Sequence, residues 1–449
     1  MSDPIAALFS TPEMLSLFSA ETHVQRILDF EAALARAEAR TGLIPQSAAD
    51  SIATGCRVDR FDVPTLYRDA AIAGTVVIPL VRELGKQVGG EAERYVHWGA
   101  TSQDAVDTAI MLQMRDGLKL LTADLLDICD TCVHLAEEHR RTMMPGRTLL
   151  QQALPITYGL KAARWLSMLT RQVDALGEVR NGSIALQFGG AAGTLAALGI
   201  NGLAVATALA DDVDLPLPDV PWHAERDRVG TIASALGVVA GAMLKIAGDI
   251  LLLSQTEVGE VSEGTAPGKG GSSAMPHKHN PVDVIMARAA ARQAISVMPL
   301  VLGAMDAEHE RAAGSWQLEW AAIPMLFCSV VGAVSRVKGA LGSLQVNTER
   351  MRANLEQGGG LLMAESAMTA LAQHLGRSEA QWLVKAATER VTAQGITLRE
   401  SLLQDEEVQR TLSASELDTA LDPAAYLGST GAWIDRALEA YGRLRGEVG

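Results

Sequence analysis

The chain has 449 residues, of which 48% are hydrophobic and 20% charged, a composition typical of a globular protein with a large core. It carries 38 Lys and Arg against 53 Asp and Glu, so its net charge of −15 argues against a general binder of nucleic acid or anionic membranes. Four cysteines are too few for a disulfide scaffold, and the N-terminus lacks the features of a signal peptide. We therefore expect a soluble cytoplasmic protein, whose substrate can still be anionic.

Helices dominate the elements expected along the chain, because aromatic residues make up only 4% and alternating β-branched runs are scarce. One clear helix, 22–41, precedes a central block in which helical periodicity runs for unusual lengths. The five long segments are 105–140, 155–181, 222–258, 281–304 and 315–346. Short helices follow, and the last covers 430–446.

This pattern predicts an all-α protein with a central long-helix bundle. We expect three domains, at 1–104, 105–346 and 347–449. The most apolar stretch, 230–253, contains Lys245 and Asp249, and we interpret it as a buried bundle helix, not as a membrane span.

A glycine-rich segment, EGTAPGKGGSS at 263–273, separates two of the long helices. It does not fit a nucleotide P-loop, because Lys269 is followed by Gly270 and no strand is expected before it. A nucleophile elbow is also absent. An ordered bundle rarely carries such a loop without a function, so we expect residues 263–276 to form a mobile active-site lid.

Two possible metal or redox patterns have ordinary explanations. Cys129 and Cys132 share one face of a long helix and have no second CxxC pair, so we expect them to pack in the core. His277 and His279 lack a carboxylate at ligand spacing. The sequence therefore predicts no metal site.

Three polar segments stand at the edges of long helices, where a packed bundle would not require them. The first is YVHWGATSQD at 95–104, in which Thr101 and Ser102 could offer hydroxyls and backbone N–H groups to an anion. The second is GRTLLQQA at 146–153, and the third is GSSAMPHKHNP at 271–281.

The third segment resembles the signature G-S-S-x-M-P-x-K-x-N-P of the fumarase/aspartase superfamily, and the first two resemble its other conserved regions. This resemblance covers essentially the whole chain. It implies a three-domain, all-α homotetramer whose twenty-helix core takes five long helices from each subunit. It further implies active sites shared between subunits, and we expect no metal or cofactor.

The resemblance also assigns site residues. It implies that Ser272 is the catalytic acid/base and that Lys278, a second catalytic residue, holds a substrate carboxylate together with Asn280. Thr101 and Ser102 are implied to bind the same carboxylate, and Gln151 to contact the substrate. We expect cationic groups around a highly charged substrate, and the candidates are His97, Arg226, Arg228 and Arg311. For each of the three arginines, the alternative is an ordinary ion pair within the protein.

Two positions depart from the superfamily pattern. Its second region normally reads G-R-T-H, and the histidine is paired with a glutamate that follows the signature; here these positions are Leu149 and Ile285. We expect Leu149 to lie in an apolar pocket. Loss of both acid/base groups points to a reaction whose leaving or attacking group needs no proton, as is true of a carboxylate, which is ionised at pH 7.

Addition of a carboxylate to a conjugated diene acid, which is lactonisation, meets this condition. Six segments resemble the branch of the superfamily that forms lactones from carboxylated muconates in aromatic degradation: 94–109, 186–199, 221–228, 266–281, 308–320 and 421–428. The expected substrate is a tricarboxylate such as 3-carboxymuconate. The alternatives are a sulfomuconate cycloisomerase, an adenylosuccinate lyase and a non-catalytic structural protein of the crystallin kind.

Overall fold

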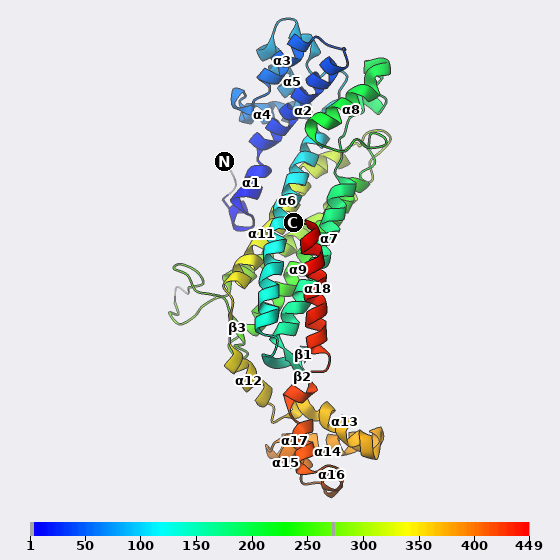
Figure 1. The fold of residues 1–449 in the computed structure, drawn as a ribbon. Helices are drawn as coiled ribbons and strands as arrows, with labels where there is room; N and C mark the ends of the chain where they lie inside the picture. Colours follow the sequence, from blue (N-terminus) through cyan, green and yellow to red (C-terminus); the bar gives the residue numbers. More distant parts are fainter. Residues whose placement is uncertain (1–3, 272–273, 449) are drawn as a thin grey trace. The chain divides into compact units, whose positions relative to one another are not determined.

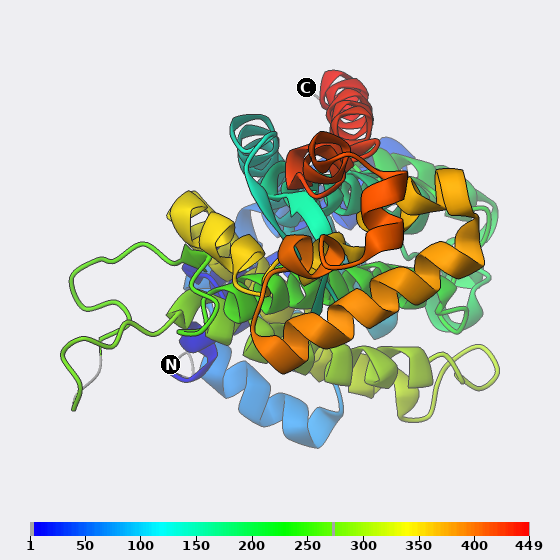
Figure 2. The ribbon, with the colours of Figure 1, turned by 90° about the horizontal axis from the view of Figure 1, so that it is seen from below.

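The computed structural model describes residues 4–271 and 274–448 (Figures 1 and 2). The chain divides into two compact units. Unit 1 comprises Met1–Leu125, Gln172–Leu244 and Met286–Arg336. Unit 2 comprises Leu126–Arg171, Lys245–Ile285 and Val337–Gly449. The structure is mostly helical, as the sequence predicts, while the division into three domains stays a prediction.

Five long helices each have residues in both units. They confirm the five long segments expected from periodicity. They are α6 (Ser102–Glu138), α7 (Tyr158–Ser183), α9 (Asp227–Leu253), α10 (Val282–Gly303) and α11 (Ser315–Gly342).

Helices α9, α10 and α11, with the stretch Ala196–Val213, are long and apolar enough to cross a membrane by length and composition alone. In α9 much of this apolar surface is buried in the protein. Its Asp249 carboxylate accepts the indole N–H of Trp165 at 2.9 Å and pairs with Lys245 at 2.6 Å. These contacts agree with the interpretation of α9 as a bundle helix.

Unit 1 also contains six shorter helices, five of them in the N-terminal region. They are α1 (Pro12–Leu17), α2 (Ala20–Arg40), α3 (Gln46–Gly55), α4 (Val63–Ala73), α5 (Val77–Val88) and, later in the chain, α8 (Gly202–Val213). The hydroxyl of Ser19 caps α2 by accepting the N–H of Thr22 at 3.1 Å. Helix α2 packs against both α3 and α8, so nearly every turn of it has a buried face.

Four short strands in unit 2 correct the expectation of a purely helical protein. Antiparallel β1 (Met143–Thr148) and β2 (Gln151–Thr157) form a hairpin, and β3 (Val261–Ser262) pairs with β4 (Gln345–Val346). Pro145 and Gly146 disfavour a helix at this point, and the register shifts beside them, between Pro145 and Arg147.

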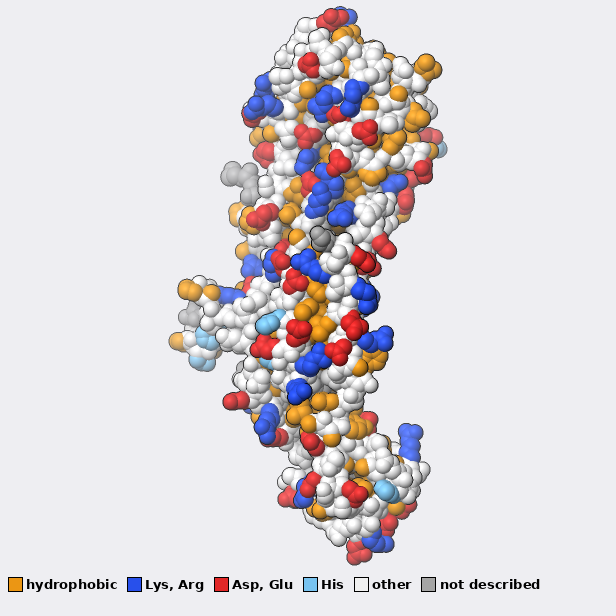
Figure 3. Space-filling view, viewed as in Figure 1, with side chains coloured by type: hydrophobic (Ala, Val, Ile, Leu, Met, Phe, Trp, Pro, Cys, Tyr) orange, Lys and Arg blue, Asp and Glu red, His pale blue; other side chains and the backbone are white. Residues whose placement is uncertain are grey.

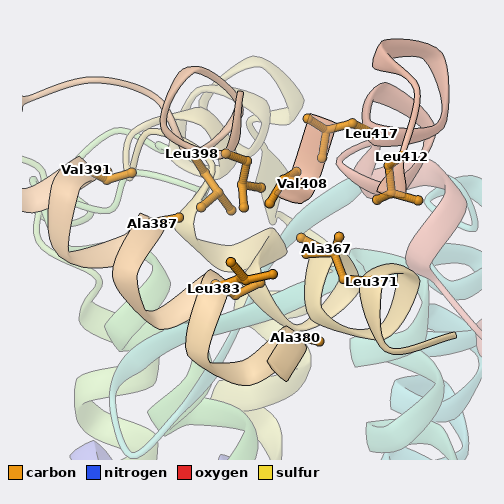
Figure 4. Packing of buried hydrophobic residues seen from close by; sticks show 12 residues of the cluster. Ala367, Leu371, Ala380, Leu383, Ala387, Val391, Leu398, Val408, Leu412 and Leu417 are labelled. Carbon is orange, nitrogen blue, oxygen red and sulfur yellow. The ribbon is translucent and has the colours of Figure 1, made fainter. Parts of the chain in front are cut away.

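The remaining helices of unit 2 follow β4. They are α12 (Thr348–Glu356), α13 (Ala364–Leu375), α14 (Arg377–Gln394), α15 (Leu398–Leu402), α16 (Glu406–Thr411), α17 (Ala414–Ala420) and α18 (Thr430–Val448). Helices α13 to α17 enclose a small core in which Leu371, Leu383 and Leu398 meet (Figure 4). Capping boxes at Thr397 and Ser413 begin α15 and α17.

Short 3₁₀ segments connect the helices, and they are Ala6–Leu8, Val58–Arg60, Ala92–Tyr95, Gly190–Ala192, Ala196–Asn201, Leu361–Met363 and Pro423–Tyr426. On the face drawn in Figure 3, basic side chains lie among acidic ones, so the negative net charge is not gathered there into one acidic patch.

Candidate active site

Asp104, in the first turn of α6, organises the first polar segment of unit 1. Its buried carboxylate accepts the backbone N–H groups of Thr101, Gly189 and Gly190, each at 2.9 Å. It also lies 2.7 Å from Nε2 of His223. One carboxylate therefore joins its own segment to two others that lie more than 80 residues further along the chain.

Glycines allow these segments to approach closely. Gly99 has φ +71°, and a Cβ atom added there would lie 2.5 Å from Leu198. Gly190 has φ +67°, and a Cβ atom there would lie 2.9 Å from the carbonyl oxygen of Gly99. Both values require glycine, because L side chains disfavour this backbone region and the space is already filled.

Thr101 and Ser102 occupy the N-terminal end of α6, and both are partly buried. The Asp104 carboxylate fixes the backbone at Thr101, and among the described residues neither hydroxyl has a hydrogen-bond partner. Free hydroxyls at the positive end of a long helix suit a carboxylate ligand.

Arg226 is buried between two carboxylates of unit 1. Its guanidinium bonds to Asp107 at 2.8 Å and to Glu319 at 3.0 Å, and it lies 4.9 Å from the ring centre of Trp222. Burial opposes the charge of Arg226, but these two anions outweigh it and raise the pKa. The geometry favours the internal ion pair for Arg226.

The other two arginines are more open. Arg311 donates to the carbonyl oxygens of Gly190 at 3.1 Å and Ala191 at 3.2 Å, so it reaches the segment that Asp104 holds. Arg228 donates to the carbonyl oxygen of Gly182 at 2.9 Å, at the end of α7. Neither arginine has a carboxylate partner among the described residues, and both keep capacity for an anion.

His97 lies four residues before Thr101 and has a left-handed backbone, with φ 60°. Its Nδ1 atom is 2.6 Å from Oε1 of Glu31, a fully buried residue of α2. Burial favours the neutral imidazole, but the charge and hydrogen bond of Glu31, together with the charge of Asp104, raise the pKa of His97 above its ordinary value.

The β1–β2 hairpin of unit 2 carries the second polar segment. Arg147 forms a two-pronged pair with the buried Glu260, at 2.7 and 2.9 Å. Asn354 of α12 donates to the same carboxylate at 2.8 Å. Gln151 begins β2 and is exposed, opposite Thr148.

Within one chain, Leu149 does not lie in the expected apolar pocket, and a pocket completed by another subunit stays a prediction. Leu149 and Leu150 form the hairpin tip with φ values of 49° and 65°, and they are 96% and 72% exposed. Ile285 is also 45% exposed, in the first turn of α10. Burial of Leu149 was expected from its apolar side chain, but an apolar residue at a family acid/base position need not be buried within its own chain.

Residues 263–271, which follow β3, and residues 274–281, which precede α10, belong to a long loop (Figure 2). Glu263 caps α10 by accepting the N–H groups of Asp283 and Val284, and Lys269 pairs with Asp283 at 2.7 Å. Lys278 is exposed, and the N–H of Asn280 donates to Gly270 at 2.8 Å.

Ser272 lies outside the described residues, so its role as catalytic acid/base stays a prediction, as does the lid at 263–276. The other predicted site residues are divided between the units. Unit 1 contains His97, Thr101, Ser102, Arg226, Arg228 and Arg311, while unit 2 contains Gln151, Lys278 and Asn280.

Sequence reasoning missed Glu31, Asp104, His223 and Glu260, the buried groups that hold the site segments. Only Asp104 had a local signal, because an acidic residue in the first turn commonly binds N-terminal N–H groups. Cys129 and Cys132 are fully buried, which confirms their packing role. Within residues 4–271 and 274–448, no group of three or more His, Cys, Asp or Glu side chains could hold a metal ion.

Comparisons with known proteins identify the family of this chain. The lyase family matches residues 8–296, and the adenylosuccinate lyase C-terminal family matches residues 360–437. A Pseudomonas aeruginosa protein named 3-carboxy-cis,cis-muconate cycloisomerase is 47% identical, over 98% of this chain and 96% of its own. A Bradyrhizobium diazoefficiens protein of the same name is 44% identical over 99% of both chains.

Among solved structures, the 3-carboxy-cis,cis-muconate lactonizing enzyme from Pseudomonas putida has a TM-score of 0.94 and 46% identity, over 98% of this chain and 99% of its own. Its fold and length therefore match this protein almost throughout. The chain belongs to the lyase family of fumarase and aspartase.

Proposed function

We infer that this protein is a 3-carboxy-cis,cis-muconate cycloisomerase, an enzyme that closes its substrate to a carboxymuconolactone. The similarity to proteins of that name, at 44–47% identity over nearly the whole chain, carries this conclusion. Leu149 and Ile285 support it independently, because neither side chain can protonate a leaving group.

The reaction forms one C–O bond without a leaving group. A substrate carboxylate attacks the conjugated diene, and electron density moves onto another carboxylate, which becomes an aci-carboxylate. Lys278, Asn280 and the Thr101–Ser102 pair are proposed to stabilise that charge. Ser272 then delivers a proton to the α-carbon and regains one from solvent.

A trianionic substrate also needs cationic partners. We propose His97, Arg228 and Arg311 for direct contacts, since each keeps donor capacity. Arg226 acts through Asp107, which also accepts the indole N–H of Trp316 at 2.9 Å. In this way Arg226 holds α6 beside α11 without touching the substrate.

We propose a homotetramer that combines residues of both units from different subunits. Apolar side chains exposed on three long helices support this, among them Val238, Ile295, Leu300 and Met325. Surfaces of this kind on long helices suit burial against other copies of the chain. The cytoplasmic location stays a prediction.

An ultraviolet assay on the tetrameric fraction tests the function, because lactonisation removes the absorbance of the conjugated diene. We expect kcat/KM for 3-carboxymuconate to exceed that for unsubstituted muconate by about 10- to 100-fold, the effect of losing one charge-assisted hydrogen bond. We also expect no cleavage of adenylosuccinate. Preference for 3-sulfomuconate would change the substrate assignment, and no turnover of any muconate would contradict the function.

Restoring the missing acid/base pair should not accelerate lactonisation. Leu149→His with Ile285→Glu supplies a proton donor that a carboxylate does not need, so we expect kcat no higher than in the parent enzyme. Because Leu149 is exposed within the chain and both leucine and histidine carry a Cβ atom in this left-handed region, stability should change by less than about 0.5 kcal/mol. Steady-state kinetics with thermal melting measures both, and a faster double variant would contradict the proposed chemistry.

A further inference from the structure

The contact between Glu31 and His97 lies within unit 1 and joins α2 to the segment that precedes α6. Glu31 is fully buried on α2, and its Oε1 atom is 2.6 Å from Nδ1 of His97. Its second oxygen, Oε2, is buried and has no hydrogen-bond partner in the described chain. A buried carboxylate with one partner depends strongly on that partner.

Glu38 lies two turns after Glu31 on the same helix and is also buried. Neither of its carboxyl oxygens has a hydrogen-bond partner in the described chain. Burial, reinforced by the charge of Glu31, raises the pKa of Glu38 to about 9. We therefore expect Glu38 to be neutral near pH 7.

The 2.6 Å contact between Nδ1 of His97 and Oε1 of Glu31 bears on the state of the imidazole. With the Glu31 carboxylate as the acceptor, Nδ1 carries the hydrogen. The charged groups that act on His97 are Glu31 from α2 and Asp104 from α6, and both are acidic. Asp104 is already paired with His223 and three backbone N–H groups, whereas Glu31 has only His97.

We propose that Glu31 is a positioning residue that holds His97 as an imidazolium, so that its Nε2–H donates to a carboxylate of the substrate beside Thr101 and Ser102. The identity of the substrate carboxylate rests on the proposed function. The pairing of Glu31 with His97 does not depend on that function. The imidazolium of His97 offsets the desolvation cost of burying the Glu31 carboxylate. In return, the carboxylate keeps His97 charged for the substrate.

Kinetics against pH provide the first test. His97 is charged below its raised pKa and loses its charge as the pH rises through it, so kcat/KM should fall on the alkaline side. In Glu31→Gln this alkaline limb should move to lower pH by about 1 to 3 pH units, the usual effect of one adjacent charge. KM should rise at pH 8 with a smaller change in kcat, while Glu31→Asp should recover part of the limb.

Glu38→Gln is the matched control, since it keeps the shape of a residue that is already neutral. We expect its pH profile to coincide with that of the parent enzyme. The proposal would be overturned if the alkaline limb of the kcat/KM profile stayed at the same pH in Glu31→Gln. It would also be overturned if the limb moved equally in Glu38→Gln.

Nitrogen-15 spectra of the histidine side chains give a second test that needs neither turnover nor a folded variant of Glu31. In the parent protein, with the His97 signals identified from His97→Asn, both ring nitrogens should be protonated at pH 7. A neutral His97, or one protonated only at Nε2, would overturn the assignment even in an active enzyme. A charged His97 in an enzyme that turns over no muconate would refute the function and leave the pairing intact.

Discussion

Replacement of Ser272 by alanine should lower kcat by about 10²- to 10⁴-fold, the usual contribution of a general acid. The substitution removes the proposed proton donor and keeps Lys278 and Asn280, which are proposed to bind the substrate carboxylate. We therefore expect a much smaller change in the dissociation constant of the substrate. Single-turnover kinetics with a separate binding measurement distinguishes the two effects.

Ser273→Ala is the matched control for that experiment, because it removes a neighbouring hydroxyl from the same segment. It should change kcat far less than Ser272→Ala. A Ser272→Ala enzyme with nearly normal kcat would refute the serine as proton donor and direct attention to Lys278 or His97.

Replacement of Arg226 by methionine should be the most destabilising of the substitutions considered. It leaves Asp107 and Glu319 as buried carboxylates without their cation, which typically costs about 3–5 kcal/mol. Arg228→Met is the matched control, since that guanidinium bonds only to a backbone carbonyl, and its stability should change by less than about 0.5 kcal/mol. Thermal unfolding at one protein concentration measures both.

The pH dependence of Arg226→Met provides a further check. Burial raises the pKa of Glu319 even though Arg226 opposes the shift, so loss of Arg226 should raise it further. A raised folded-state pKa favours folding below the unfolded value and loses that contribution as the pH rises. The variant should therefore be least impaired near pH 4–5 and most impaired above neutrality. Equal loss of stability in both arginine variants would contradict the internal role of Arg226.

The long helices could be predicted because each repeats its apolar positions over many turns. The expected segment 281–304, for example, differs by only one residue at each end from α10. The β1–β2 hairpin could not be predicted in this way, since its strands contain Pro145, Gly146 and Pro155 and lack a regular alternation. The hairpin is defined by the pairing between its strands and by the contact of Arg147 with Glu260, and the local sequence of each strand indicates neither.

The candidate site likewise contains residues that the sequence could predict and residues that it could not. Motif resemblance indicated the residues proposed to meet the substrate, such as Thr101 and Lys278. It did not indicate the buried groups behind them, because Glu31 lies 66 residues from His97 and Glu319 lies 93 residues from Arg226. Contacts at such separations arise from the packing of helices, and one sequence alone carries no signal for them.

The Leu149–Leu150 tip also bears on how the register of the hairpin is set. Two consecutive left-handed residues match a type I′ turn, which favours Asn-Gly, and a leucine costs about 1–2 kcal/mol at each such position. This turn cannot begin the pairing of its own strands. The register of β1 with β2 must instead be fixed from outside, by the clasp of Arg147 with Glu260 and by the bond from Gln152 to the carbonyl oxygen of Asn354. The register of the hairpin therefore depends on contacts with Glu260 and α12, which lie outside it.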